Sequence, residues 1–196
     1  MVGHNGDEGL LFTDPFLTTN QEVLDYTTTA IPTLKGLPQV VDYINNTLYP
    51  GIYDGSQAQN YTNMIERLAA MNSELIFTCN TYYLDKAFKN NTHAYYFVVP
   101  PATHGADIGY TFYTGDGQTN MSYSSGSVIA PSIAIAMQEW ITHFAEAGTP
   151  NAAGLPYFAT YTNQTTVETL NTTGITEMMD PAANYRCDWW QKALYA

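Results

Sequence analysis

The clearest strand in this chain is the stretch Ala94-Tyr-Tyr-Phe-Val-Val99, which Pro100-Pro101 brings to an end. It is short, rich in aromatic and β-branched residues and apolar on both faces, as is typical of a central strand covered by helices. The residues that follow Pro101 are therefore expected to form a loop at the carboxyl end of a buried strand. Catalytic groups of α/β proteins commonly lie in such loops.

Apolar residues at helical spacing flank this strand on both sides. The spacing predicts one helix over residues 37–48, one or two over 61–88 with a joint at Asn72-Ser73, one over 132–146 and a last one over about 184–194. Short strands are expected over 157–161 and 165–170 around a turn at Asn163, and an exposed loop over 115–126. This order of elements is α/β in character, with too few strands to close a sheet.

Composition excludes several classes of protein. The chain has 196 residues, 45% of them hydrophobic, with no repeat and no linker long enough to divide it into domains. Its net charge of −12, with a pI of about 4.3, means that the protein repels nucleic acid and anionic lipid. No stretch approaches the roughly 18 apolar residues that a transmembrane segment needs, and residues 1–9 lack the basic start and apolar run of a secretory signal.

Cysteines and sequons bear on the compartment. Cys79 and Cys187 are either free buried thiols or one disulfide, and their number does not choose between the two. Asn-x-Ser/Thr sequons, which favour a secreted glycoprotein, occur at Asn45, Asn60, Asn90, Asn120, Asn163 and Asn171.

Two segments carry candidate catalytic groups. His104 follows the predicted strand and stands beside Gly105, which allows an unusual backbone turn. Near the start of the chain, Asp7 and Glu8 stand before Gly9. Taken alone, a loop histidine is more often structural or solvated, and Glu8 is either a solvated turn residue or an orienting carboxylate.

These segments recur in one order in the type-B carboxylesterase and cholinesterase family of α/β-hydrolases. Gly3-His-Asn-Gly-Asp-Glu-Gly9 resembles the family's Gly-x-Asn-x-Asp-Glu-Gly segment, which supplies the triad acid, here Glu8. His104-Gly-Ala-Asp107 resembles the His-Gly-x-Glu/Asp segment, which supplies the triad histidine, here His104. Residues 140–151, from Trp140 to Pro150-Asn151, are similar to its Trp-x-x-Phe-Ala-x-x-Gly-x-Pro-Asn helix end, and Leu155-Pro-Tyr157 echoes its Trp-Pro-x-Tyr segment with Leu for Trp.

The resemblance spans essentially the whole chain and looks closest to secreted fungal members. It implies that residues 1–196 are the C-terminal part, about the last two-fifths, of a single α/β-hydrolase domain. The fold expected is a mostly parallel central sheet flanked by helices, incomplete without the N-terminal part. It also implies a disulfide between Cys79 and Cys187. The chain is then expected to be a fragment, a cleaved second chain or a truncated form.

One departure from the family pattern limits what the chain can do alone. No Gly-x-Ser-x-Gly nucleophile motif and no Gly-rich oxyanion segment occurs in the sequence. The expected function is therefore carboxylic ester hydrolysis by a Ser-Glu-His triad, for which this chain supplies Glu8 and His104. The serine would come from the N-terminal segment, the expected partner, and the isolated chain is expected to be inactive.

The remaining expectations concern ligands and alternatives. The expected substrate is a small-molecule or lipid ester of a secreted lipase-type enzyme, and no metal or cofactor is implied, since His4, His93, His104 and His143 show no ligand spacing. One alternative is a non-catalytic cholinesterase-like adhesion or binding module, against which the retention of Glu8 and His104 argues. Another is a Tyr-rich carbohydrate-binding protein, but the three tryptophans fall in predicted helices and are expected to pack in the core.

Overall fold

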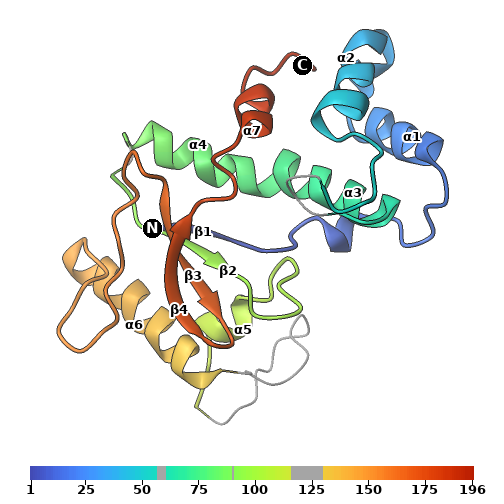
Figure 1. Ribbon diagram of the computed structural model, residues 1–196. Helices are drawn as coiled ribbons and strands as arrows, with labels where there is room; N and C mark the ends of the chain where they lie inside the picture. The colour runs from blue at the N-terminus through green and yellow to red at the C-terminus, as the bar shows by residue number, and fades with distance from the viewer. Residues whose placement is uncertain (57–60, 90, 116–129) are drawn as a thin grey trace.

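The computed structural model describes residues 1–56, 61–89, 91–115 and 130–196. These residues form a four-stranded mixed sheet in the order β1-β2-β3-β4, shown in Figure 1. Its strands are β1 Val2–Asn5, β2 Ala94–Phe97, β3 Thr166–Asn171 and β4 Gly174–Met179. The first three run parallel and β4 pairs antiparallel with β3, so the sheet is mostly parallel as the resemblance implied.

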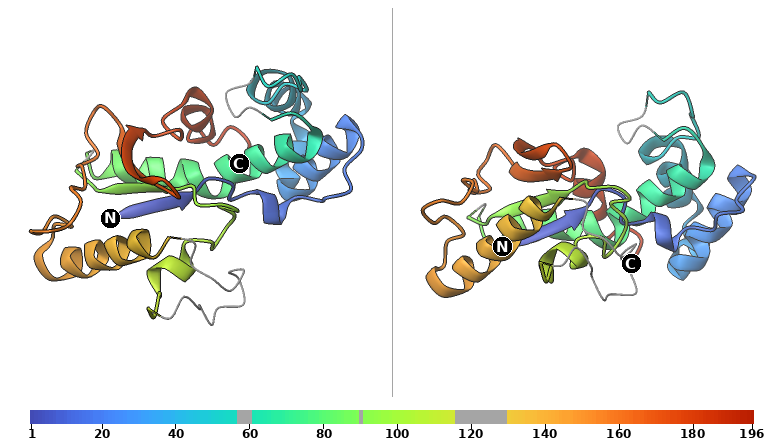
Figure 2. Two further views of the ribbon diagram at one scale, coloured as in Figure 1. Left: turned by 60° about the horizontal axis from the view of Figure 1, so that its bottom comes forward. Right: turned by 90° about the horizontal axis from the view of Figure 1, so that it is seen from below.

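Helices cover both faces of this sheet, as Figure 2 shows. On one face, α3 Met64–Asn72, a π-helical segment Ser73–Thr78 and α4 Cys79–Ala87 follow one another without a break. On the other face lies α6 Pro131–Ala147, which ends at the left-handed Gly148. The predicted joint at Asn72-Ser73 is the point where the hydrogen-bonding pattern changes from α to π.

Side chains of the strands alternate between two hydrophobic clusters, as the pleat requires. Ala94 and Val167 belong to the cluster under α3 and α4. Phe97 and Leu170 belong to the cluster under α6, where Trp140 is fully buried. The short strand apolar on both faces is thereby confirmed, and so is the core position of the tryptophans, since Trp189 and Trp190 are buried as well.

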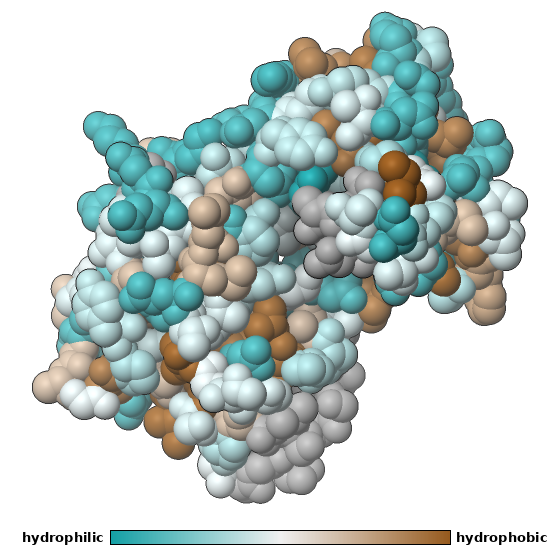
Figure 3. All heavy atoms as spheres, in the orientation of Figure 1, coloured by the Kyte–Doolittle hydropathy of each residue, from teal (hydrophilic) through white to brown (hydrophobic). Residues whose placement is uncertain are grey.

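The other elements lie around this three-layer core. The remaining helices are α1 Asn20–Ala30, α2 Pro38–Tyr43 with a π-helical continuation Ile44–Leu48, α5 Ile108–Thr111 and α7 Tyr185–Trp190, with short 3-10 turns at Leu10–Phe12 and Pro32–Gly36. None of the helices in the described residues is both long and apolar enough to cross a membrane. On the face drawn in Figure 3, hydrophobic side chains are scattered among hydrophilic ones.

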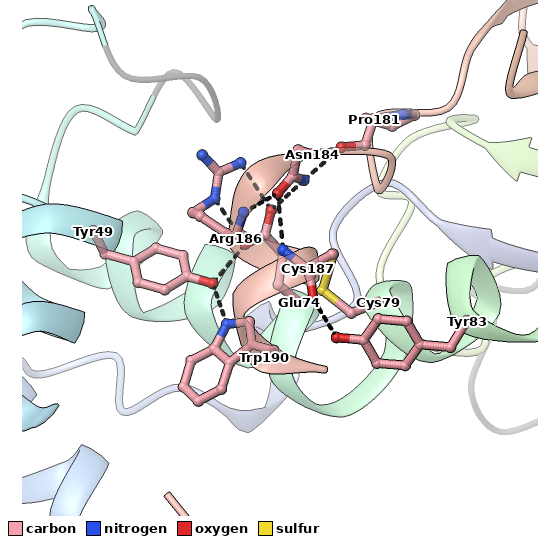
Figure 4. Close-up of polar contacts among 9 residues, drawn as sticks. All are labelled: Tyr49, Glu74, Cys79, Tyr83, Pro181, Asn184, Arg186, Cys187 and Trp190. Carbon is pink, nitrogen blue, oxygen red and sulfur yellow. Dashed lines mark hydrogen bonds and ion pairs between the residues drawn. A yellow bond between two sulfur atoms is a disulfide. The ribbon is translucent and has the colours of Figure 1, made fainter. Parts of the chain in front are cut away.

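The last helix, α7, is attached to the continuous helical segment formed by α3, residues 73–78 and α4, which we call the helix rod. The attachment consists of covalent and ionic contacts, shown in Figure 4. A disulfide joins Cys187 of α7 to Cys79 of α4, 108 positions apart in sequence, so the implied pairing is present. Beside it, Arg186 forms an ion pair with Glu74 at 2.8 Å, and both side chains are almost fully buried. Tyr49 donates its hydroxyl to the same Glu74 carboxylate at 2.5 Å.

One predicted strand is wrong, and β4 lies where no strand was predicted. Residues 157–161 form only a single bridge, between Tyr161 and Thr92, because side chains occupy the backbone groups that a strand would pair. The Asn151 amide both donates to and accepts from the backbone of Phe158. The predicted strand 165–170 matches β3, but it pairs with β4, whose residues are mostly exposed and lack the apolar alternation that would have identified it.

The sequons do not share one environment. Asn45, in a sequon near the end of the predicted helix 37–48, is buried, and its side chain is hydrogen-bonded to Val41 and to Arg67. Asn45 belongs to the π-helical continuation of α2, and its burial speaks against a glycan there, because a glycan needs a side chain that meets solvent. Asn163 is exposed and Asn171 half-buried, whereas Asn60, Asn90 and Asn120 lie outside the described residues, as does most of the predicted loop 115–126.

Candidate active site

The parallel pairing of β1 with β2 brings two distant loops together. Asn5 stands opposite Phe97 at the carboxyl ends of the strands, and the two segments that follow leave the sheet at the same edge. The pairing continues past the strands, because Gly6 N–H donates to the Phe97 carbonyl and Asp7 N–H to the Ala102 carbonyl, each at 2.8 Å. Glu8 and His104 each follow these paired segments, as the strand-end position of His104 led us to expect.

Glu8 and His104 form a hydrogen-bonded pair although they are 96 positions apart in sequence. His104 Nδ1 lies 2.6 Å from Glu8 Oε2. The other oxygen, Oε1, accepts the backbone N–H of Asn5 at 2.7 Å. Because a carboxylate faces Nδ1, that nitrogen carries the proton and Nε2 keeps its lone pair. Nε2 has no hydrogen-bond partner among the described residues.

The two members of the pair differ in burial. The Glu8 side chain is 6% exposed and that of His104 is 46% exposed. A buried carboxylate stabilises an adjacent imidazolium strongly because solvent does not screen it, whereas a half-exposed imidazole can reach a reacting group. The arrangement is therefore that of an acid held inside the protein and a base at its surface.

Two aromatic rings fix the plane of the imidazole. The Phe77 ring centroid lies 4.5 Å from that of His104, and Phe12 meets it edge-on at 5.3 Å. Phe77 belongs to the π-helical segment Ser73–Thr78. The apolar spacing of this region indicated core packing alone, so the contact of Phe77 with His104 was not foreseen, and no local signal marks it.

The loop after β1 that carries Glu8, which we call the acid loop, approaches the helix rod so closely that only glycine fits after Glu8. The Gly9 N–H donates to Ser73 Oγ at 2.7 Å. A Cβ on Gly9 would lie 2.0 Å from the Ala69 carbonyl oxygen and 2.6 Å from the Ser73 nitrogen, both backbone atoms that cannot move aside. This contact anchors the acid loop against the helix junction.

Asp7, the acidic residue that precedes Glu8 in sequence, takes no part in the pair. Burial, and secondarily the charge of Glu66, raise its pKa, and it lines a separate cavity that it shares with Glu66. Its backbone bridges to Thr103, while its neighbour Glu8 makes the contact with His104. Of these two acidic side chains, Glu8 is the one in contact with His104.

A cavity of about 350 Å³ opens at the pair and is lined by Glu8, His104, Phe77 and Ile108 among others. Within the described ranges, no group of three or more His, Cys, Asp and Glu side chains is placed to ligate a metal ion. The chemistry that the pair offers is proton transfer at His104 Nε2, supported by the Glu8 carboxylate. The sequence holds no Gly-x-Ser-x-Gly motif to accompany it.

A carboxylate and a histidine in two loops at the carboxyl edge of a mostly parallel sheet, with helices on both faces, match part of the α/β-hydrolase class. Within that class, the chain belongs to the carboxylesterase family: a sequence model described as the Carboxylesterase family matches residues 1–190.

Comparison with individual proteins agrees. The chain is 34% identical over 155 residues to carboxylesterase patB of Penicillium expansum, covering 78% of this chain and 26% of that protein. It is 30% identical over 148 residues to carboxylesterase patB of Aspergillus clavatus, covering 76% and 25%. The structure of Aspergillus niger EstA superposes with a TM-score of 0.76 at 18% identity, over 97% of this chain and 39% of EstA. The chain thus spans about a quarter of the length of the two patB relatives.

Proposed function

We propose that this chain supplies the acid and the histidine of a Ser-Glu-His triad that hydrolyses carboxylic esters. The observation that carries the proposal is the 2.6 Å contact between Glu8 Oε2 and His104 Nδ1, which leaves Nε2 with a free lone pair. Membership of the carboxylesterase family and the name of the patB relatives support the reaction class.

In the proposed mechanism, His104 Nε2 removes the proton from a serine hydroxyl as that oxygen attacks the ester carbonyl. The Glu8 carboxylate stabilises the imidazolium that forms, and His104 then gives the proton to the leaving alcohol, which leaves the acyl group on the serine. His104 next removes a proton from water as that water attacks the acyl group, and returns the proton to the serine oxygen as the carboxylic acid leaves. The serine and the oxyanion-hole N–H groups belong to a segment outside residues 1–196, which is the proposed partner of this chain. The order serine, acid, histidine along the polypeptide is that of the α/β-hydrolases.

We further propose that the substrate is a small-molecule or lipid ester and that the protein is secreted. The disulfide between Cys79 and Cys187 supports the second point, because such bonds persist in oxidising compartments. A non-catalytic adhesion module is the weaker candidate, since adhesion alone needs no buried carboxylate paired with an exposed histidine.

The test is ester hydrolysis by the protein at its full natural length, with a p-nitrophenyl acyl ester as substrate. His104→Ala is expected to lower kcat/KM by about 10⁴-fold or more, because the triad acts as a unit. Glu8→Gln is expected to lose about 10³- to 10⁴-fold, since tautomer control and imidazolium stabilisation fail together. His143→Ala, at the far end of α6, is the matched control and should retain wild-type activity.

Residues 1–196 alone should show no hydrolysis above the background of an exposed histidine. A full-length His104→Ala variant that hydrolyses the ester at near wild-type rate would show that the assignment of His104 is wrong.

A further inference from the structure

A second carboxylate lies behind the proposed acid. Asn5 Nδ2 donates to Asp107 Oδ1 at 3.1 Å and to Glu8 Oε1 at 3.3 Å, so one amide group bridges the two carboxylates. On its other oxygen, Asp107 accepts the Tyr95 hydroxyl at 2.8 Å. The chain of contacts therefore runs from Tyr95 through Asp107 and Asn5 to Glu8 and His104.

The carboxylates determine which way the Asn5 amide faces. Both hydrogens of its NH₂ group point to carboxylate oxygens, while its Oδ1 is buried with no hydrogen-bond partner among the described residues. The reversed amide would turn its carbonyl lone pairs toward two negative charges and leave both carboxylates without that donor. Asp107 thus holds Asn5 in the orientation in which its N–H faces Glu8.

Helix capping does not account for the Asp107 side chain. Asp107 precedes α5 at the N-cap position, yet its carboxylate makes no capping hydrogen bond there. Both carboxylate oxygens instead face Asn5 and Tyr95, and the Tyr95 ring packs in the cluster under α6. The contacts of the side chain are directed at the acid loop, not at its own helix.

We propose that Asp107 is a positioning residue for the Glu8–His104 pair. Together with Tyr95 it fixes the Asn5 amide, which holds Glu8 Oε1 and so keeps Oε2 directed at His104 Nδ1. Its negative charge also favours the imidazolium form of His104, because a nearby anion stabilises a cation. This inference rests on the proposed function, since it concerns the same pair.

The first test does not depend on activity. In the protein labelled with ¹³C-histidine, the pKa of His104 is measured by NMR titration, and the resonance is assigned by its loss in His104→Ala. Asp107→Asn keeps the shape of the side chain and removes its charge, so the His104 pKa is expected to fall below that of the wild type. Asp25→Asn, on the exposed face of α1, is the matched charge control and should leave the His104 pKa unchanged.

The second test is the pH dependence of kcat/KM with the p-nitrophenyl ester. The active histidine is neutral, so a lower His104 pKa moves the acid limb of the profile to lower pH in Asp107→Asn. We expect kcat/KM on the plateau to fall about 10- to 100-fold, because Glu8 is less well held. A role in folding alone would lower the melting temperature without moving the acid limb.

The outcomes are separable. An unchanged His104 pKa in a folded Asp107→Asn variant overturns this inference, whether or not the wild-type protein hydrolyses esters. A lower pKa in a protein without esterase activity supports the positioning role and contradicts the proposed function instead. If Asp107→Asn does not fold, Asp107→Ser, which also removes the charge, decides: a fall of the His104 pKa supports the inference, and no fall overturns it.

Discussion

At the scale of single residues, His4 on β1, which precedes the acid loop, shows how burial disfavours the charged form of a side chain. His4 is buried against Tyr96, and burial lowers its pKa to about 4. Thr81 donates its hydroxyl to the Thr78 carbonyl, so it can only accept from His4 Nδ1. His4 is therefore held as the neutral Nδ1–H tautomer, adjacent in sequence to the Asn5 that supports Glu8.

A consequence for stability follows from that lowered pKa. The unfolded chain binds a proton at His4 near pH 6.5 but the folded protein only near pH 4, so acidification through this window favours unfolding. Between pH 7 and pH 4.5, His4 alone should reduce the free energy of unfolding by about 2 to 3 kcal/mol.

His4→Gln retains an N–H donor toward Thr81 and cannot be protonated. Its stability, measured by urea denaturation at both pH values, should fall by about 2 kcal/mol less than that of the wild type. Equal losses in the two proteins would show that His4 is not buried in the neutral form.

At the scale of elements, α7 is attached to the helix rod by a buried ion pair that contrasts with an exposed one close by. The Glu74 carboxylate accepts hydrogen bonds from Nε and Nη2 of Arg186, at 2.8 and 2.9 Å. The side chain of Glu74 is 6% exposed and that of Arg186 is 4% exposed. Lys86 and Asp188 also join α4 to α7, at 3.2 Å, but they are 40% and 53% exposed. The physical difference is solvent screening.

Arg186→Met should destabilise the protein by about 3 to 5 kcal/mol, because it leaves the Glu74 carboxylate buried without its counter-charge. Lys86→Met, which breaks the exposed pair, should cost less than about 1 kcal/mol. Urea denaturation with the disulfide intact compares the two variants. Adding Glu74→Gln to Arg186→Met, which removes the buried charge and keeps an acceptor for the Tyr49 hydroxyl, should recover part of the loss. Similar costs for the two single variants would contradict the assignment.

Elements that carry their own local signal were the ones foreseen. The buried strand β2 and the helices α3, α4 and α6 have regular apolar periodicity, which reports directly on one buried face or two. Helix α1 was not foreseen because only Val23 and Thr27 are buried along it. Its capping box, in which Thr19 and Glu22 bond each other's backbone, was the available signal.

At the scale of the whole molecule, two sequons whose asparagines are exposed or half-buried lie near the two ends of β3. Asn163 is exposed in the turn before β3, and Asn171 is half-buried at its last position. A glycan is large and hydrophilic, so it is tolerated where the side chain meets solvent and not where it is packed.

We therefore predict N-glycans at Asn163 and Asn171, and none at Asn45, in protein produced by a eukaryotic secretory host. Deglycosylation should increase the electrophoretic mobility, and peptide mapping should locate the modified residues. Asn163→Gln and Asn171→Gln should each remove one glycan. Fully unmodified peptides at both positions would argue against passage through the secretory pathway.

The sequence by itself determined the local features of this protein. The α/β order of elements, the strand-end loop that holds His104 and the family resemblance of residues 3–9 and 104–107 are properties of short segments. The absence of a Gly-x-Ser-x-Gly motif is likewise a property of the sequence. Each of these depends on neighbours along the chain, so periodicity and motif spacing report it.

Only the tertiary structure decided how distant segments act on one another. The register of β1 against β2 sets the 2.6 Å contact between Glu8 and His104 and excludes Asp7. The Asn5 bridge to Asp107 and the contact of Phe77 with His104 also join residues far apart in sequence. The reason is physical: these contacts depend on where packing places two backbones in space, and no local pattern encodes that position.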